Sequence, residues 1–247
     1  QGGNSGGITN TGGISLLEDY VIADSDSDGN LDGNVALGTN RHGIFLQAGP
    51  TFTGDIVNSG LISVEGNASS GITLNGLLTG NLRSTGTVNM IGDNSVGIAV
   101  NGGVTGDVII AGGGQIRGEN SVGIAVDSNI GGQLSVNGTW NVLGYLSTIV
   151  PTNQATLDPD DKEQGGPAVL VSGNVAGGIT IEGVGVESDP DDDGDGLTDD
   201  TDDNNTAQIS VYGSSPALLI QADGANITTG PGAEGYGSVA TGGRGGR

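Results

Sequence analysis

Short apolar pairs recur along this chain in a constant phase, with one residue between the two members of each pair. The heptapeptide Asn94–Val100 (NSVGIAV) returns unchanged as Asn120–Val126, which is 26 positions later. A column of such pairs reads Ile44/Leu46, Ile72/Leu74, Ile98/Val100, Ile124/Val126, Val169/Val171 and Leu218/Ile220. Apolar residues at i and i+2 place both side chains on one face of a short strand. Each pair therefore predicts a strand.

Two further apolar columns recur in step with the first. The second column reads Ile56, Leu82, Val108, Leu134, Ile179 and Ile227, and the third reads Ile62/Val64, Val88/Met90, Ile116 and Trp140/Val142. A fixed period of this size indicates stacked supersecondary units. The pattern predicts an all-β fold: a right-handed parallel β-solenoid (β-helix) with three short strands per coil of about 26 residues.

The alternatives to a solenoid fit less well. A helical repeat needs an amphipathic stripe of helix-forming residues, whereas glycine supplies 51 of the 247 residues here. A sandwich or barrel of hairpins would reverse the phase between columns, and the columns do not reverse. The hydrophobic content of 34% suits a thin stacked core. We therefore expect one β-helix domain over residues 1–247, a fragment of a longer chain, with loop insertions at about 23–33, 145–166 and 188–206.

Charge and cysteine content narrow the classes of function. The chain has 6 basic and 29 acidic residues, a net charge of −23. Such a field disfavours binding to nucleic acid and to anionic lipid. There is no cysteine, so disulfides and thiolate metal sites are excluded. No apolar run reaches the roughly 18 residues of a membrane-spanning helix, and we expect no such segment.

Two acidic segments fit the pattern D-x-D-x-D-G-x-x-D. Alternate carboxylates converge on one cation when such a loop curls, glycine permits the sharp turn, and the next residue can offer its carbonyl. The ligands predicted for Ca²⁺ are Asp24, Asp26, Asp28, Asn30 and Asp32 in the first loop, and Asp191, Asp193, Asp195, Leu197, Asp199 and Asp202 in the second. The first loop lacks an acid at its twelfth position, so it needs another ligand, such as Asp19 or a carbonyl.

The placement of the insertions adds to this prediction. Both acidic loops are expected at the same corner of the coil, between its second and third strands and five coils apart. Calcium is expected to order them and to stiffen the solenoid. The third insertion also contains acids (Asp158, Asp160, Asp161 and Glu163) but lacks the glycine-bearing motif. It is predicted to be a protruding loop with no assigned ion.

The two loops resemble the calcium loops of thrombospondin type 3 and dockerin repeats, which share this core of aspartates. The repeats resemble the β-helical passenger domains of type V autotransporters and related bacterial surface proteins. That second resemblance rests on G-I-x-(V/L)-x-G units such as Gly71–Gly76, and on T-G-(D/N) corners such as Thr53–Asp55 and Thr105–Asp107. It implies an exported passenger at the bacterial cell surface, attached to the outer membrane through a C-terminal region beyond this sequence.

The expected function is therefore that of a non-catalytic, secreted or cell-surface adhesin or structural protein. Its expected partner is a host or neighbouring-cell surface, as glycan or protein, or another copy of the chain. One alternative is a β-helical carbohydrate-active enzyme, and another is a subunit of an extracellular filament or surface layer.

Asp55 and Asp107 are interpreted as corner residues rather than a catalytic pair, and His42 as a turn residue. Trp140 is predicted to be buried, and Tyr145 to be an exposed candidate for glycan contact.

Overall fold

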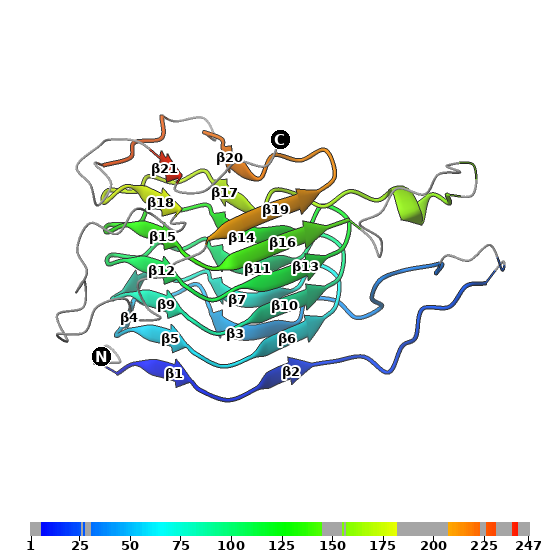
Figure 1. Cartoon of the computed structure of the whole chain (residues 1–247). Helices are drawn as coiled ribbons and strands as arrows, with labels where there is room; N and C mark the ends of the chain where they lie inside the picture. The colour runs from blue at the N-terminus through cyan, green and yellow to red at the C-terminus, as the bar shows by residue number, and fades with distance from the viewer. Residues whose placement is uncertain are drawn as a thin grey trace, which may run out of the picture.

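The chain winds repeatedly through three long parallel sheets, which Figure 1 shows as a stack of coils. This computed structural model describes residues 6–25, 27, 31–144, 155, 157–181, 207–222, 226–230 and 239–241. Neighbouring strands within a long sheet come from successive coils and run parallel, so no hairpin builds these sheets. The predicted parallel β-solenoid is confirmed.

Each coil supplies one strand to each sheet. The first sheet runs β1 (Ile8–Asn10), β5 (Ile56–Asn58), β9 (Leu82–Ser84), β12 (Val108–Ile110), β15 (Leu134–Val136), β18 (Ile179–Ile181) and β21 (Val239–Thr241). The second runs β2 (Ile14–Leu16), β6 (Ile62–Glu65), β10 (Val88–Ile91), β13 (Gly114–Arg117), β16 (Thr139–Leu143) and β19 (Gln208–Tyr212). The third runs β3 (His42–Leu46), β7 (Ser70–Leu74), β11 (Val96–Val100), β14 (Val122–Val126), β17 (Val169–Val171) and β20 (Leu218–Ile220). A short pair, β4 (Phe52–Thr53) and β8 (Leu78–Thr79), lies between the third and first sheets along the chain.

The register stacks equivalent residues of successive repeats directly on one another. Ile98 is the partner of Ile72 on one side and of Ile124 on the other. All three side chains are fully buried. Burying an isoleucine contributes about 1.5–3 kcal/mol at most, so a column of them supplies much of the stability of the stack.

Buried hydrogen bonds explain the serine of the repeated heptapeptide. The backbone N–H of Ser69 donates to Ser95 Oγ at 3.1 Å, and that of Ser95 donates to Ser121 Oγ at 3.0 Å. Ser95 Oγ in turn donates to the Gly66 carbonyl, and Ser121 Oγ to the Gly92 carbonyl. Each buried hydroxyl is thus both acceptor and donor, which offsets the free energy that its burial costs.

Trp140 is the largest buried side chain, and a glycine of the neighbouring strand β13 and one of β11 in the third sheet make room for it. Its indole is fully buried, and Nε1–H donates to the Gly112 carbonyl at 3.0 Å. A Cβ atom on Gly97 would lie 2.7 Å from Trp140 Cζ3, and one on Gly114 would lie 2.6 Å from the same atom. The prediction that Trp140 fills the core is confirmed.

The insertions do not occupy the corners that the sequence analysis assigned to them. The first loop follows β2 and returns to β3, whereas residues 182–207 connect β18 to β19 and therefore lie at a different corner. The expectation that the two acidic loops share one corner is wrong, because Ile14 and Leu16 pair with the third apolar column rather than the second. The insertion that shares the corner of the first loop is the third one, between β16 and β17.

Substitution of Gly97 by alanine tests the close stacking of the coils. The added Cβ would lie 2.5 Å from the Gly123 carbonyl oxygen as well as against Trp140, so backbone and core must both shift. We expect Gly97→Ala to lower the free energy of unfolding by about 1–3 kcal/mol in denaturant titrations. The matched control is Gly13→Ala, whose Cβ would meet nothing within 4 Å. Equal losses in the two variants would contradict this packing.

Candidate functional site

The structure describes two of the predicted calcium ligands, Asp24 and Asp32. The others lie outside the described residues: Asp26, Asp28 and Asn30 in the first loop, and Asp191, Asp193, Asp195, Leu197, Asp199 and Asp202 in the second. Ligation by these residues therefore stays a prediction. What the described residues show is how the first loop is held and what it meets.

Hydrogen bonds that its own carboxylates accept help to tie the two sides of the first loop together. Ala23 and Asp32 form an antiparallel bridge, in which the Asp32 N–H donates to the Ala23 carbonyl at 3.0 Å. Asp32 Oδ2 accepts hydrogen bonds from the N–H and the hydroxyl of Ser25, at 2.5 and 2.8 Å. Asp24 Oδ1 accepts one from the Ser27 N–H at 2.6 Å. Both carboxylates thus lie beside the backbone of the loop that they close.

The third insertion carries its own compact turn. The 3₁₀ helix η2 (Asp160–Lys162) follows Pro159, and Asp161 Oδ2 accepts a hydrogen bond from the Asp158 N–H at 3.1 Å. Lys162 Nζ donates to the Leu157 carbonyl at 2.8 Å. These bonds orient the acidic side chains that lie around η2.

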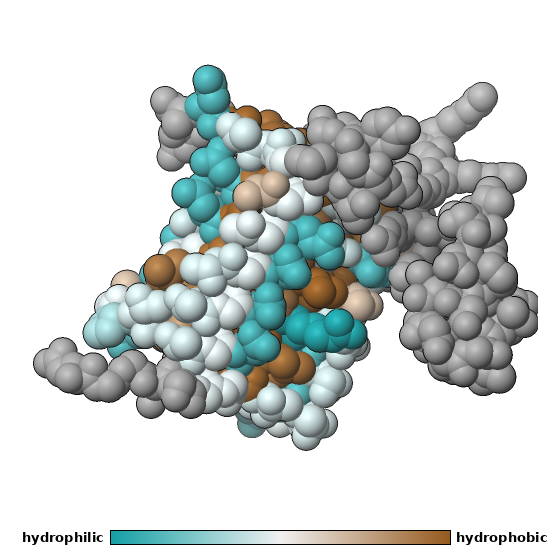
Figure 2. Space-filling view, turned by 90° about the vertical axis from the view of Figure 1, so that its left-hand side faces the viewer, coloured by the Kyte–Doolittle hydropathy of each residue, from teal (hydrophilic) through white to brown (hydrophobic). Residues whose placement is uncertain are grey.

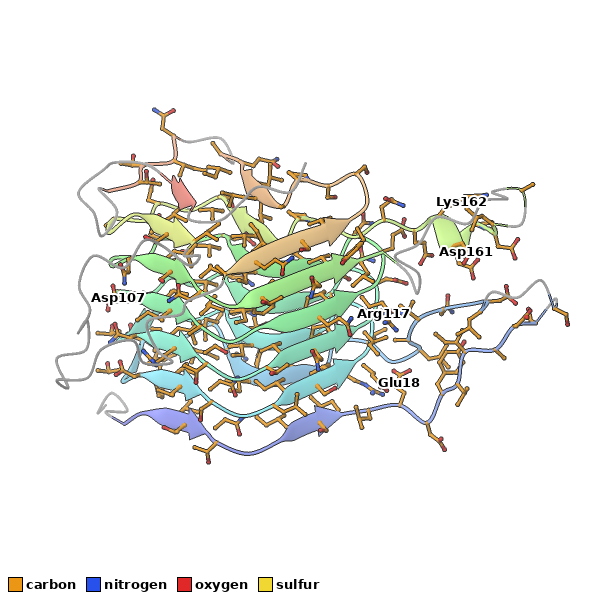
Figure 3. All side chains as sticks on the ribbon, viewed as in Figure 1. Glu18, Asp107, Arg117, Asp161 and Lys162 are labelled. Carbon is orange, nitrogen blue, oxygen red and sulfur yellow. The ribbon has the colours of Figure 1, made fainter. Side chains whose placement is uncertain are left out.

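The two insertions meet outside the stack. Both project from the same side of the molecule, with the third insertion above the first loop (Figure 3). The Gly33 N–H donates to Asp160 Oδ2 at 2.7 Å, although these residues are 127 positions apart. Asp32, Asp158 and Asp160 each offer a carboxylate oxygen, and the three oxygens lie within 4.8 Å of one another. We call these three residues the carboxylate triad.

The carboxylate triad has the composition of a site for a hard cation. Each of its residues is partly buried, and each contributes oxygen, which suits divalent metal ions of the calcium and magnesium class. Three negative charges at this separation repel one another unless a cation lies between them. The triad can therefore hold a metal ion, although neither Asp19 nor Asp24 belongs to it.

Sequence reasoning missed Asp158 and Asp160 as members of this group. A signal was present, since assigning Ile14 and Leu16 to the third apolar column puts both insertions after a strand of the second sheet. In that sheet β16 is the fourth strand beyond β2, a separation of roughly 19 Å at the bases of the insertions. Only the folded lengths of both insertions show that they close this gap.

Glu163 extends the acidic surface from the third insertion to the corner of the stack. Its pKa is raised to about 7, first by burial and then by the negative charges of Asp93, Glu119 and Asp160. Asp93 and Glu119 are themselves stacked, since the Glu119 N–H donates to Asp93 Oδ1 at 2.8 Å. Glu163 thus changes its charge near neutral pH.

A second ladder of polar side chains runs up the opposite corner, where Figure 3 labels Asp107. Asp55 Oδ1 accepts the N–H of Asn81, Asn81 Oδ1 accepts that of Asp107, and Asp107 Oδ1 accepts that of Gln133, at 2.7–2.9 Å. Figure 2 views this side and shows hydrophilic residues in a band that climbs the stack. The interpretation of Asp55 and Asp107 as corner residues is confirmed, because each side chain satisfies the backbone of the next coil.

His42, the sole histidine, is not in a turn, and that prediction is wrong. It begins β3, where its ring stacks on Phe45 with centroids 4.6 Å apart. His42 Nδ1 shares a hydrogen bond of 2.7 Å with Ser70 Oγ in the next coil, and burial lowers its pKa. The register of the third sheet therefore fixes its position. Tyr145 lies outside the described residues.

Comparisons with known proteins give no further assignment. No protein-family model, curated protein or solved structure matches this chain. Among the described residues, none forms a helix that is both long and apolar enough to cross a membrane. The site is therefore interpreted from its own geometry.

The raised pKa of Glu163 predicts a pH dependence of stability. The folded state keeps the Glu163 proton to a higher pH than the unfolded chain, so the contribution of this group to stability falls as pH rises from about 4.5 to about 7. Glutamine cannot ionise, so Glu163→Gln does not lose this stability as pH rises. In thermal melts with a chelator, we expect the variant to unfold at a higher temperature than wild type at pH 8 and at the same temperature at pH 4.

The control for this prediction is Asp107→Asn. It removes one negative charge from a distant ladder and keeps a side-chain oxygen that can accept the Gln133 N–H. It should not reproduce the difference between pH 8 and pH 4. A melting temperature of Glu163→Gln that parallels wild type across this range would contradict the assignment.

Proposed function

We propose that this chain is a non-catalytic structural or adhesive β-helix of a secreted or cell-surface protein, a stiff spacer that displays its insertions and is braced by calcium. The observation that carries the proposal is the junction of the first loop with the third insertion at the carboxylate triad. A cation held there would tie the first coil to the fifth along the outside of the stack, in parallel with the hydrogen-bonded sheets.

The chemistry of the triad favours calcium over other ions. Ca²⁺ takes six to eight oxygen ligands in flexible geometry, whereas Mg²⁺ requires a nearly ideal octahedron. Three carboxylates from two separate loops suit the flexible geometry better. The remaining ligands would be carbonyls, water and the predicted residues Asp26, Asp28 and Asn30. Calcium sites of extracellular modules have dissociation constants of about 10⁻⁴–10⁻³ M, and we expect the affinity of this site to lie in that range.

The surface of the stack supports a role in display. Side chains of the corner ladders are occupied with the backbone of the next coil, so they stiffen the rod. The first and third insertions project well beyond the sheets (Figure 1). A host or neighbouring-cell glycan or protein would contact such projections, as in the bacterial passenger domains that the repeats resemble. The same resemblance supports attachment to the outer membrane through a further C-terminal region.

Calcium titration with matched variants tests the brace. We expect calcium to raise the melting temperature of the chelator-treated chain, with a stabilisation of about 2.7 kcal/mol at a concentration one hundred times the dissociation constant. Asp160→Asn should remove the part of this gain that comes from the triad, while Asp107→Asn, which also removes one charge, should keep it. Hydrogen exchange locates the effect, because calcium should slow exchange of the Gly33 amide only where Asp160 is intact.

Equal calcium responses in Asp160→Asn and Asp107→Asn, with no change in exchange at Gly33, would exclude the triad as a calcium site. A calcium-induced rise in melting temperature that persists in Asp160→Asn but disappears in Asp195→Asn would assign calcium to the second loop instead. The two loops are thereby tested separately.

Small-angle X-ray scattering tests the display role against assembly into filaments. A displayed spacer should remain a monomer with one maximum dimension at all protein concentrations, with or without calcium. A maximum dimension that grows with concentration would favour the subunit of a filament or surface layer, since unpaired end strands can template further pairing.

A further inference from the structure

A hollow of about 250 Å³ lies between the base of the first loop and the corner of the second sheet. Its walls are mostly apolar, from Tyr20, Val21, Ile22 and Leu31 of the loop and Ile91 of β10. Val21 exposes 83% of its surface and Leu31 exposes 43%. The hollow is therefore lined in part by two aliphatic side chains, Val21 and Leu31, that remain exposed in the folded chain.

Two acids at the rim of the hollow are already engaged. Glu18 forms an ion pair with Arg41, with Nη1 and Oε1 3.5 Å apart, and Glu18 Oε2 accepts the Leu37 N–H at 2.8 Å. Glu65 Oε2 accepts the Glu18 N–H at 2.6 Å. The charge of Glu18 is therefore partly neutralised by Arg41, and the carboxylate of Glu65 is held by a backbone N–H.

Arg117 is the basic residue that lines the hollow, and it forms no ion pair with a described residue. Within the described part of the chain, Arg117 Nε is shielded from solvent and has no hydrogen-bond partner, and Arg41–Glu18 is the one ion pair. The neighbours of Arg117 in the sheet, Ile91 and Leu143, are apolar and offer no counter-charge. Figure 3 shows Arg117 at the corner beside the first loop, above Glu18. A guanidinium that lines the hollow and has no partner among the described residues marks a place for a ligand acceptor.

We propose that this hollow binds a carboxylate that carries an apolar body, with the Arg117 guanidinium as the partner of the carboxylate. Arginine presents a planar fork that pairs with both oxygens of a carboxylate, and the aliphatic walls bury the attached hydrocarbon. Such a ligand is either a fatty acid or the C-terminal carboxylate of a peptide that ends in an apolar residue. The inference goes beyond the proposed function and does not depend on bound calcium.

Isothermal titration with two probes tests the site, namely octanoate and N-acetyl-leucine, each compared with its amide. The measurements use about 0.15 M salt, which screens the overall negative field beyond about 8 Å, and are made with chelator and with calcium. We expect at least one carboxylate to bind and its amide to bind at least about tenfold more weakly. The preferred probe identifies the source as fatty acid or peptide terminus. Absence of binding by both carboxylates would overturn the proposal.

Variants separate the role of Arg117 from general effects of charge. Arg117→Gln should weaken carboxylate binding at least about tenfold, and Arg117→Lys should be intermediate because it keeps the charge and loses the fork. Arg83→Gln is the matched control, since Arg83 is an exposed arginine of β9 in the first sheet. Equal affinities of Arg117→Gln and Arg83→Gln would refute the assignment.

A second variant covers the case in which Arg117→Gln does not fold. Val21→Asp places a negative charge at the rim, and because Val21 is so exposed, this change should leave the melting temperature unaltered. It should abolish binding of the carboxylate by repulsion. Undiminished binding in folded Val21→Asp would place the ligand elsewhere and overturn the proposal.

Discussion

The in-register pairing of each coil with the next is the constraint on which the rest of this structure depends. A strand of one coil hydrogen-bonds to the same strand of its neighbours, so every coil must return to the same position after one turn. That requirement explains why the apolar columns keep their spacing and why the described insertions leave from corners. One extra residue within a strand would shift every side chain beyond it to the opposite face.

The same constraint governs the polar residues. In two ladders, that of Ser69, Ser95 and Ser121 and that of Asp55, Asn81 and Asp107, a side-chain oxygen accepts a backbone N–H of an adjacent coil. Buried Asn58 instead donates to the hydroxyl of Ser84 in the next coil. Trp140 is accommodated differently, because glycines of β11 and β13 leave the volume that its indole fills. The residues at one position of the repeat can therefore differ between coils, provided that the residues they contact in neighbouring coils differ to match.

Electrostatics gives the insertions a role that the stack alone does not provide. A chain with a net charge of −23 pays a repulsive cost wherever acids gather, and here Asp32, Asp158 and Asp160 gather at the junction of two insertions. The first loop contributes to this junction and, at its base, to the hollow beside Arg117. The proposed brace and the proposed ligand site thus share one structural element, so order in the first loop bears on both.

The sequence by itself determined the three strands of the central coils, the stacking of Ile72, Ile98 and Ile124 and the burial of Trp140, because strand periodicity and repeat length are local properties that a column of residues records. It misplaced strands of the end coils, since Ile14 pairs with Ile62, and Val239 rather than Ile227 pairs with Ile179. It also identified the first acidic loop through Asp24 and Asp32. Only the tertiary structure decided that this loop meets Asp158 and Asp160, and that Arg117 faces the hollow without a partner. Those contacts join segments up to 127 positions apart and depend on how far each insertion reaches and which corner it leaves from, which no local pattern specifies.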